Sequence, residues 1–227
     1  MKSKLPPGQY ESDNFPRFGL SQYANRFPVD IDFIRLIVGK EGFTDVDISK
    51  ELEKFSRVEQ TSDFHCVTTW SKSNQVWTGV RFKDFYEQLV RPRFSDADDL
   101  IFVIFKAQDG YKTGLYLEDV LKDNVLLADH LNGEPLSIEH GAPLRLIAPD
   151  HYGYKNLKHL KRIEFYTEKK KVKQGILGFM DHPRARVAYE ERAVGGPGWF
   201  FRFLYRPLVK STAKQFDKAM KKYYAMK

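Results

Sequence analysis

The sequence predicts an α+β protein whose body is mainly β, with short helices and a C-terminal helical tail. Aromatic residues make up 15% of the 227 residues, with 18 Phe and 12 Tyr, which favours strands over a helical bundle. Short apolar runs bounded by Gly, Pro, Asn and Asp recur through most of the chain, as in a β-rich body. Only the C-terminal segment shows the apolar spacing of a long amphipathic helix.

The first third of the chain predicts an arm followed by strands. Residues 1–29 carry four prolines among Gly and Asn, so we expect an extended arm that wraps a body formed later. The β-rich run 31–38 ends at Gly39, and 46–55 starts as a strand and turns helical, with Ser49 as the candidate N-cap. The strand 57–66 then leads into Cys66.

The rest of the body follows the same pattern. Apolar residues in 80–89 have helical spacing, and 100–106 and 111–117 predict two strands paired across a Gln-Asp-Gly turn. Further strands are expected at 125–128, 144–148 and 159–166. A flexible Gly-Gly-Pro-Gly breaker then precedes an aromatic segment and a helix whose apolar face would hold Ala213, Phe216, Met220 and Tyr223.

Composition limits the function classes. A net charge of +7 allows anionic partners: a phosphate-bearing cofactor, an oxyanion, nucleic acid or an acidic membrane surface. A single cysteine excludes an internal disulfide framework and any Cys-only zinc or iron–sulfur site within one chain. The N-terminus has no apolar leader, and no window approaches the roughly 20 apolar residues that span a bilayer, so we expect a cytoplasmic protein.

Two segments carry the chemistry. In the first, Asp-Phe-His-Cys-Val-Thr-Thr-Trp-Ser at 63–71, Cys66 stands where a β-run gives way to a polar loop. A lone cysteine is either a small buried hydrophobe or a ligand, and only its neighbours distinguish the two. The second reads His-Gly-Ala-Pro-Leu-Arg-Leu-Ile-Ala-Pro at 140–149 and continues as His-Tyr-Gly-Tyr-Lys-Asn-Leu-Lys at 151–158.

Together the two segments resemble the cofactor-binding motifs of the sulfite oxidase family of molybdoenzymes. The similarity is greatest to small bacterial and archaeal members and to the catalytic subunit of the periplasmic methionine-sulfoxide reductase, and runs from about residue 5 to about residue 192. The resemblance implies the mixed-sheet body of the sulfite oxidase molybdopterin-binding fold. It also implies a molybdopterin-binding oxidoreductase domain over 1–194, followed by an aromatic and lysine-rich extension over 195–227.

The resemblance further implies one molybdenum–molybdopterin per chain, with the thiolate of Cys66 as the metal ligand. The chemistry agrees, because a molybdenum held by pterin dithiolene sulfurs takes one further thiolate. The pterin phosphate requires cations, which Arg145, Lys155 and Lys158 supply. The family's pattern places further cofactor contacts at His140, Asn156, Leu157 and, in the arm that closes over the pterin, Asp13, Asn14 and Arg17. Alternatively, Arg145 is a solvated strand residue and the two lysines form an exposed charged face.

Trp70 indicates the substrate class. Sulfite-oxidising members carry an arginine at that position, so an aromatic residue resembles the reductase branch and suits a neutral S-oxide or N-oxide. Sulfite oxidation remains the alternative, because Arg or Lys from elsewhere could rebuild an anion site. His65 either faces the metal or packs behind it, although strand alternation argues that it points away from Cys66. The other candidates for the pocket wall are His151, Tyr152 and Trp77.

Partners and competing functions follow from what the sequence contains. With no second cysteine, no CxxCH haem motif and no Gly-rich dinucleotide fingerprint, electrons must come from a separate partner such as a quinone, a flavoprotein or a small cytochrome. Two other functions stay open: a non-catalytic basic module for an anionic surface, and hydrolysis by a Cys–His pair. Nucleic acid is not expected, since no recognition motif is present. The extension either docks on a membrane surface or an acidic protein, or packs back onto the body.

Overall fold

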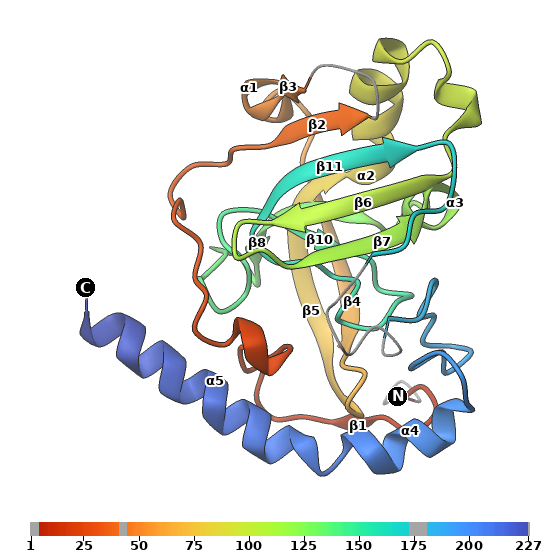
Figure 1. The fold of residues 1–227 in the computed structure, drawn as a ribbon. Helices are drawn as coiled ribbons and strands as arrows, with labels where there is room; N and C mark the ends of the chain where they lie inside the picture. Colours follow the sequence, from red (N-terminus) through yellow and green to blue (C-terminus); the bar gives the residue numbers. More distant parts are fainter. Residues whose placement is uncertain (1–4, 41–44, 173–180, 227) are drawn as a thin grey trace.

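The computed structural model describes residues 5–40, 45–172 and 181–226. Its body is built from two mixed β-sheets with short helices around them (Figure 1). The strands are β1 (Tyr10–Glu11), β2 (Ile37–Lys40), β3 (Val46–Asp47), β4 (Val58–His65), β5 (Trp70–Arg81), β6 (Phe102–Ala107), β7 (Lys112–Tyr116), β8 (Leu126–Leu131), β9 (Glu134–Pro135), β10 (Arg145–Ile147) and β11 (Leu160–Tyr166). The helices are α1 (Ser49–Leu52), α2 (Phe82–Phe85), α3 (Leu117–Val120), α4 (Gly198–Tyr205) and α5 (Leu208–Ala225).

The first sheet has the order β1-β5-β8-β10, with β4 also paired to β5 and β9 to β8, and the second has the order β3-β2-β11-β6-β7. Both are mixed, because β1 runs parallel to β5 and β2 parallel to β11, while the other pairs are antiparallel. The α+β class and the mixed-sheet body predicted from the sequence are therefore confirmed.

The main hydrophobic core is formed by residues of the two sheets and of α2. It includes Val80 and Leu127 from the first sheet and Val103, Phe105 and Ile163 from the second, all fully or almost fully buried. Each such side chain stabilises the fold by about 1.5–3 kcal/mol relative to exposure. The long β4–β5 hairpin extends from this core towards the N-terminal arm, as Figure 1 shows, so its turn is held well away from the second sheet.

Most predicted strands are confirmed, and the differences have local causes. Only Ile37 and Val38 of the run 31–38 pair in a sheet. The whole of β5 was missed, because its first half is polar and lacks the alternation of a half-buried strand. The cap prediction was wrong: Ser49 is the first residue of α1, and its Oγ accepts a hydrogen bond from the backbone N–H of Leu36. The helix expected over 80–89 begins only at Phe82.

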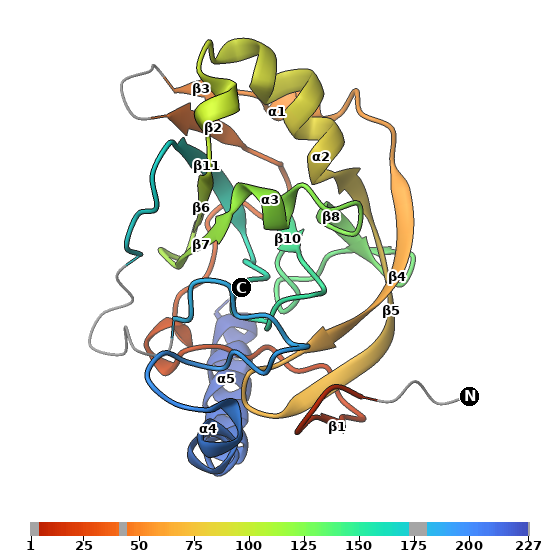
Figure 2. The ribbon, with the colours of Figure 1, turned by 90° about the vertical axis from the view of Figure 1, so that its right-hand side faces the viewer.

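The arm and the tail pack against each other. Residues 5–29 run along the foot of the β4–β5 hairpin, and α5 covers them on the outside, an arrangement visible along the lower edge of Figure 1 and end-on in Figure 2. Phe216 of α5 packs on Ala24 and stacks on Phe18, with 6.3 Å between ring centroids. Tyr223 stacks on Phe27 at 4.3 Å. The apolar face predicted for the tail helix is therefore the face that meets the arm.

The shorter helix α4 packs differently. Its inner residues Phe201 and Tyr205 form a small cluster with Ala193 and reach Val67, next to the cysteine. In the part of the chain that the structure describes, neither this helix nor any other is long and apolar enough to cross a membrane.

Candidate active site

The turn between β4 and β5 holds the only cysteine. The backbone N–H of Cys66 donates to the carbonyl of Trp70 at 2.8 Å, and the N–H of Thr69 donates back to the carbonyl of Cys66 at 3.1 Å. Thr69 has a φ of 87°, a conformation that costs free energy for a β-branched residue and that the surrounding contacts must maintain. The side-chain amide of Gln9, from the arm, also donates to the Cys66 carbonyl at 3.1 Å. The backbone of Cys66 is therefore held both by the turn itself and by the N-terminal arm.

The thiol itself lies in a dry environment. Cys66 is 7% exposed, and its Sγ is 3.1 Å from the hydroxyl of Thr68. Burial raises the pKa of the Cys66 thiol, and the nearby charges of Arg192 and Lys158 offset only part of this effect. Burial therefore favours the protonated thiol, and a positively charged metal beside it would stabilise the thiolate.

Buried cations lie close to the turn. Arg145 is fully buried, and its guanidinium donates to the carbonyls of His140 at 2.7 Å and Asn156 at 3.4 Å. The ammonium of Lys158 donates to the carbonyl of Glu139 at 2.6 Å. Burial lowers the pKa of Arg145 to about 9 and holds the pKa of Lys158 well below its usual range. Among the described residues neither forms a salt bridge with a carboxylate, so both are available to an anion.

Arg17 extends this group of cations. Its charge contributes to lowering the pKa of Lys158, and burial lowers its own pKa. Its guanidinium donates to the carbonyl of Ala24 at 2.6 Å and lies over the rings of Phe27 and Phe216, at 4.4 and 5.1 Å. Because Arg145 is 0% exposed, the sequence alternative in which Arg145 is a solvated strand residue is wrong.

Gly141 explains how two cationic side chains come so close. A Cβ at this position would lie 3.1 Å from the Cβ of Lys158 and 3.2 Å from the Cβ of Arg145, and the residue has a φ of +111°. Only glycine combines this backbone conformation with this close approach without strain. The His-Gly-Ala-Pro-Leu-Arg segment therefore brings Arg145 against Lys158 through its glycine.

An aromatic cluster adjoins the cations. Phe15, from the arm, lies 4.6 Å from the ring of His140 and 5.0 Å from Phe64, and 6.2 Å from both Trp70 and Trp77. In the described parts of the chain, the buried polar atoms without a hydrogen-bond partner include Nδ1 of His140, Nε of Arg145 and Nε1 of both tryptophans. Leaving such groups unpaired costs about 1–3 kcal/mol each. A ligand with a polar ring edge and an anionic end, such as molybdopterin, fits this set of residues.

The loop 151–158 is tied to the cysteine turn. The N–H of Gly153 donates to the carbonyl of His65 at 2.7 Å, and the Phe64 ring occupies the space that a Cβ on Gly153 would need. The Asn156 side chain holds the loop together by accepting from the N–H of Ala148 at 2.7 Å. The Leu157 carbonyl accepts from the N–H of Leu146 at 2.9 Å, so both residues fix the backbone that leads directly into Lys158.

Three predicted site residues differ from the expectation, because one is paired with a carboxylate and two are exposed. Lys155 is buried, but its ammonium pairs with Asp181 at 2.8 Å, so it adds no free charge to the cluster. Asp13 and Asn14 have exposed side chains. Their neighbour Phe15 enters the aromatic cluster instead, and the sequence reasoning did not single it out, because an aromatic residue in a proline-rich arm has no distinguishing pattern.

The predicted catalytic residues His65 and Tyr152 and the pocket-wall candidate His151 are all buried, but each has different neighbours. The His65 ring nitrogen Nδ1 is 2.7 Å from the Ser71 hydroxyl across the hairpin, and burial lowers the pKa of His65. Tyr152 is fully buried, and burial raises its pKa to about 12. The imidazole of His151 faces Asp119 of α3, 3.9 Å away. The structure gives the thiol Thr68 as its side-chain partner rather than a histidine, which argues against a Cys–His hydrolase.

Arg192 was not predicted to have a role, yet it joins three segments at the site. Its guanidinium donates to the carbonyl of Val67 at 2.6 Å and to that of Pro7 at 3.1 Å, and pairs with Glu190 at 3.1 Å. It also lies 4.9 Å above the ring of Tyr152. An isolated arginine in a loop carries no local signal, so only the fold reveals this role.

Comparison with known proteins agrees with this geometry. The family model described as the oxidoreductase molybdopterin binding domain matches residues 26–174. The uncharacterized oxidoreductase YuiH of Bacillus subtilis is 34% identical over 168 residues, which are 73% of this chain and 80% of YuiH. The catalytic subunit MsrP of the protein-methionine-sulfoxide reductase of Campylobacter jejuni is 30% identical, over 86% of this chain and 80% of MsrP.

Other relatives are longer than this chain. MsrP of Xanthomonas campestris is 27% identical, and the match covers 66% of this chain but 53% of that protein. Among solved structures, the sulfane dehydrogenase SoxCD of Paracoccus pantotrophus superposes with a TM-score of 0.51 at 20% identity, over 67% of this chain and 44% of that one, a likeness of fold. The fold, the buried thiol with its cations and the family match lead to one conclusion: this chain belongs to the sulfite oxidase family of molybdopterin-binding oxidoreductases.

Proposed function

We propose that the chain holds molybdenum–molybdopterin through the Cys66 thiolate and uses it to reduce an S-oxide or an N-oxide. One observation carries the proposal: the only cysteine is buried within reach of the charge of Lys158, and Lys158 lies against Arg145 across Gly141, with neither cation paired to a carboxylate among the described residues. When bound, the cofactor supplies two-electron oxygen-atom transfer. Family membership already excludes a purely non-catalytic binding module as the main function.

The protein groups have separate roles in this proposal. Arg145 and Lys158 bind the anionic end of the cofactor through charge-assisted hydrogen bonds, and Arg17 adds positive potential from the arm. The backbone at Asn156 keeps Lys158 in place. The arm closes the site from the other side through Phe15 and excludes water from the thiol.

Two observations support a neutral oxide as the substrate. Trp70, which is 2% exposed, stands where sulfite-oxidising members of the family have an arginine. Arg192 does not replace that arginine, because its guanidinium is already bonded to Val67, Pro7 and Glu190. Relatives named protein-methionine-sulfoxide reductase act on a neutral sulfoxide, which is the same class of substrate. Sulfite oxidation is the weaker candidate, since the arginine that its members carry is replaced by Trp70 and Arg192 is already bonded elsewhere.

Electrons would come from a separate partner, since the only cysteine is assigned to molybdenum and cannot also hold an iron–sulfur cluster. The name MsrP denotes a catalytic subunit, which agrees with a division of labour between catalysis and electron delivery. The cytoplasmic location expected from the sequence stays a prediction, and fractionation of cells that express the untagged chain would check it.

The test uses protein expressed in a host that makes the molybdenum cofactor. We expect about one molybdenum per chain and reduction of methionine sulfoxide or trimethylamine N-oxide with reduced viologen. Cys66→Ser should lose molybdenum or turnover while keeping its fold, as judged by circular dichroism, because a hydroxyl is a poorer ligand than a thiolate. The exposed substitution Lys161→Gln is the matched control and should behave as wild type.

Two results would contradict the proposal. A fully active Cys66→Ser enzyme would exclude the cysteine as the ligand. Sulfite-dependent reduction of cytochrome c, with no activity towards either class of oxide, would place the chain in the oxidising branch of the family despite Trp70.

A further inference from the structure

The net positive charge of this protein is concentrated at one end of the chain. Residues 195–227 contain eight of the 37 Lys and Arg and one of the 30 Asp and Glu, so this segment alone has a net charge of +7. Residues 1–194 then hold 29 basic and 29 acidic residues and are neutral overall. The positive surface potential therefore belongs to the α4–α5 segment rather than to the cofactor-binding body.

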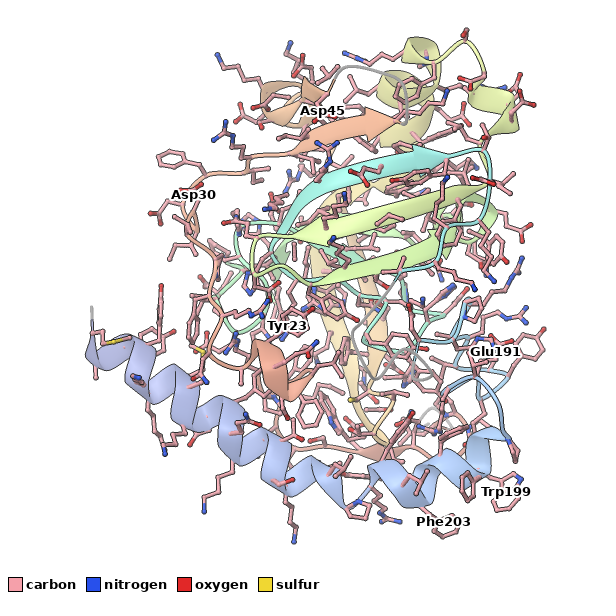
Figure 3. All side chains as sticks on the ribbon, viewed as in Figure 1. Tyr23, Asp30, Asp45, Glu191, Trp199 and Phe203 are labelled. Atoms are coloured by element: carbon pink, nitrogen blue, oxygen red, sulfur yellow. The ribbon has the colours of Figure 1, made fainter. Side chains whose placement is uncertain are left out.

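The outer side of α4 carries large apolar side chains that are exposed to solvent. Trp199 is 56% exposed, Phe200 46%, Phe203 73% and Leu204 49%. Figure 3 shows Trp199 and Phe203 at the outer edge of α4, pointing away from the body. Four large apolar side chains in one eight-residue helix form a patch, whereas isolated exposed apolar residues are ordinary.

On α5 the outer side is basic. Lys210, Lys214 and Lys218 are exposed and four residues apart, so they form one stripe along the helix. The opposite side of α5 carries Phe216 and Met220, which are buried. Side chains ending in nitrogen project from the outer edge of α5 in Figure 3, on the same lower edge as the α4 aromatics.

The two surfaces meet at the junction of the helices. A shallow hollow of about 310 Å³ lies there, lined by Phe203, Arg206, Pro207 and Lys210. It places two cations beside an aromatic ring and a proline. This combination can hold a lipid phosphate next to the first part of its acyl chain.

We propose that the outer face of α4–α5 lies on an anionic lipid membrane, with the α4 aromatics in the interface and the α5 lysines against the headgroups. Trp and Phe next to Lys and Arg are the composition of helices that lie in the membrane plane. The face is a ridge along one edge of the molecule, which fits a flat lipid surface (Figure 1). An acidic protein would instead need a pocket for each aromatic anchor, and it is the alternative that the experiment separates.

Flotation with vesicles tests the proposal on the full chain carrying its cofactor. We expect binding to vesicles of phosphatidylcholine mixed with phosphatidylglycerol, weaker binding to phosphatidylcholine alone, and release as salt is raised. Wild-type fluorescence gives a second readout, because Trp70 and Trp77 are at most 2% exposed and Trp199 is the exposed one of the three tryptophans. Binding should shift the emission of Trp199 to the blue and protect it from an aqueous quencher.

Two variants separate the apolar and the basic contributions. Lys210→Gln/Lys214→Gln/Lys218→Gln should lower the partition coefficient roughly 100-fold, since each lysine near an anionic surface contributes about fivefold. The control Lys50→Gln/Lys54→Gln/Lys161→Gln removes the same charge from the body and should bind as wild type.

In the second variant, Trp199→Ser/Phe203→Ser should lower the partition coefficient about tenfold or more, while Val29→Ser/Phe33→Ser, at residues 89% and 76% exposed, should not. The proposal is overturned if the wild type stays unbound at low salt, or if the body controls lose as much binding as the tail variants. It is equally overturned if an immobilised acidic polypeptide retains the chain while anionic vesicles do not, which would identify an acidic protein as the partner.

Discussion

Among single residues, the fully buried Arg145 and the partly buried Lys158 are the cations that we propose to bind the anionic end of the cofactor. Burial lowers the pKa of both, so each is more stable when a negative group lies next to it. The hydrogen bonds that they donate go to carbonyls, which carry no net charge to neutralise them, and Nε of Arg145 has no partner among the described residues. A bound phosphate would supply that charge.

Lys158→Ala should therefore weaken retention of the cofactor roughly 10- to 150-fold, the equivalent of one charge-assisted hydrogen bond of about 1.5–3 kcal/mol. Arg145→Ala should act in the same direction. The molybdenum-to-protein ratio after extensive dialysis measures the effect, and the exposed Lys161→Ala is the control. If both variants kept wild-type occupancy, the phosphate would bind elsewhere.

At the scale of structural elements, Arg192 connects the cysteine turn, the arm and the segment before α4. Arg192→Ala would leave the carbonyls of Val67 and Pro7 without their donor and Glu190 without one of its partners. We expect a loss of about 3–5 kcal/mol in the free energy of unfolding, because removing one partner leaves buried groups uncompensated. Urea denaturation measures it.

Arg186→Ala is the matched control for Arg192→Ala. Arg186 also pairs with a glutamate, Glu191, at 2.7 Å, but its side chain is 29% exposed, so the loss should stay below about 1 kcal/mol. Equal effects of the two substitutions would show that Arg192 has no special role in joining the segments.

The contact between α5 and the arm gives a second prediction at this scale. Phe216 is 3% exposed and contacts Ala24, Phe18 and Arg17. Phe216→Ala should lower the free energy of unfolding by about 3–5 kcal/mol and also reduce cofactor retention, because Arg17 loses the ring it lies on. Phe203→Ala, at a residue 73% exposed, should do neither.

The contact between α5 and the arm also affects whether residues 195–227 can be removed from the body. The sequence left open whether residues 195–227 pack back onto the body, and the packing of α5 on the arm predicts a loss of cofactor binding and stability when they are removed. A chain that ends near residue 192 and keeps both its cofactor and its stability would show that α5 is an appendage after all.

For the whole molecule, two buried histidines predict sensitivity to acid. His151 and His159 are 2% and 1% exposed, and burial lowers their pKa values to about 4 and about 3. The unfolded chain binds these protons near pH 6.5, but the folded chain does not, so stability is full above that pH and falls as the pH drops towards about 4. These two protons contribute roughly 2.7 kcal/mol per pH unit to the slope, and His140, whose pKa burial lowers to about 3, adds to it in the same direction.

His159→Asn isolates one of the two contributions. An asparagine amide can replace the imidazole Nδ1, which lies 2.7 Å from the Ala142 carbonyl, and it tolerates the φ of 55° at this position. Urea unfolding at a series of pH values should give the variant near wild-type stability at pH 7.5 and a slope lower by about 1.4 kcal/mol per pH unit. An unchanged slope would mean that His159 protonates in the folded chain.

By itself, the sequence determined the features that depend on local pattern. Continuous apolar runs identified strands such as β6 and the start of β8, and helical periodicity identified the face of α5 that is buried. The cysteine count identified Cys66 as the one available thiolate, and the resemblance of segments 63–71 and 140–158 to known motifs indicated the family to which the chain belongs. These inferences succeed because neighbouring residues in the chain carry the whole signal.

Only the tertiary structure decided which side chains meet. Arg192 reaches Val67 across 125 positions and Pro7 across 185, and no local pattern records such contacts. The same holds for Lys155, whose charge is paired with Asp181 on a distant segment. Whether a cation is free for a ligand depends on the partner that folding brings to it, and burial sets how strongly that partner is needed.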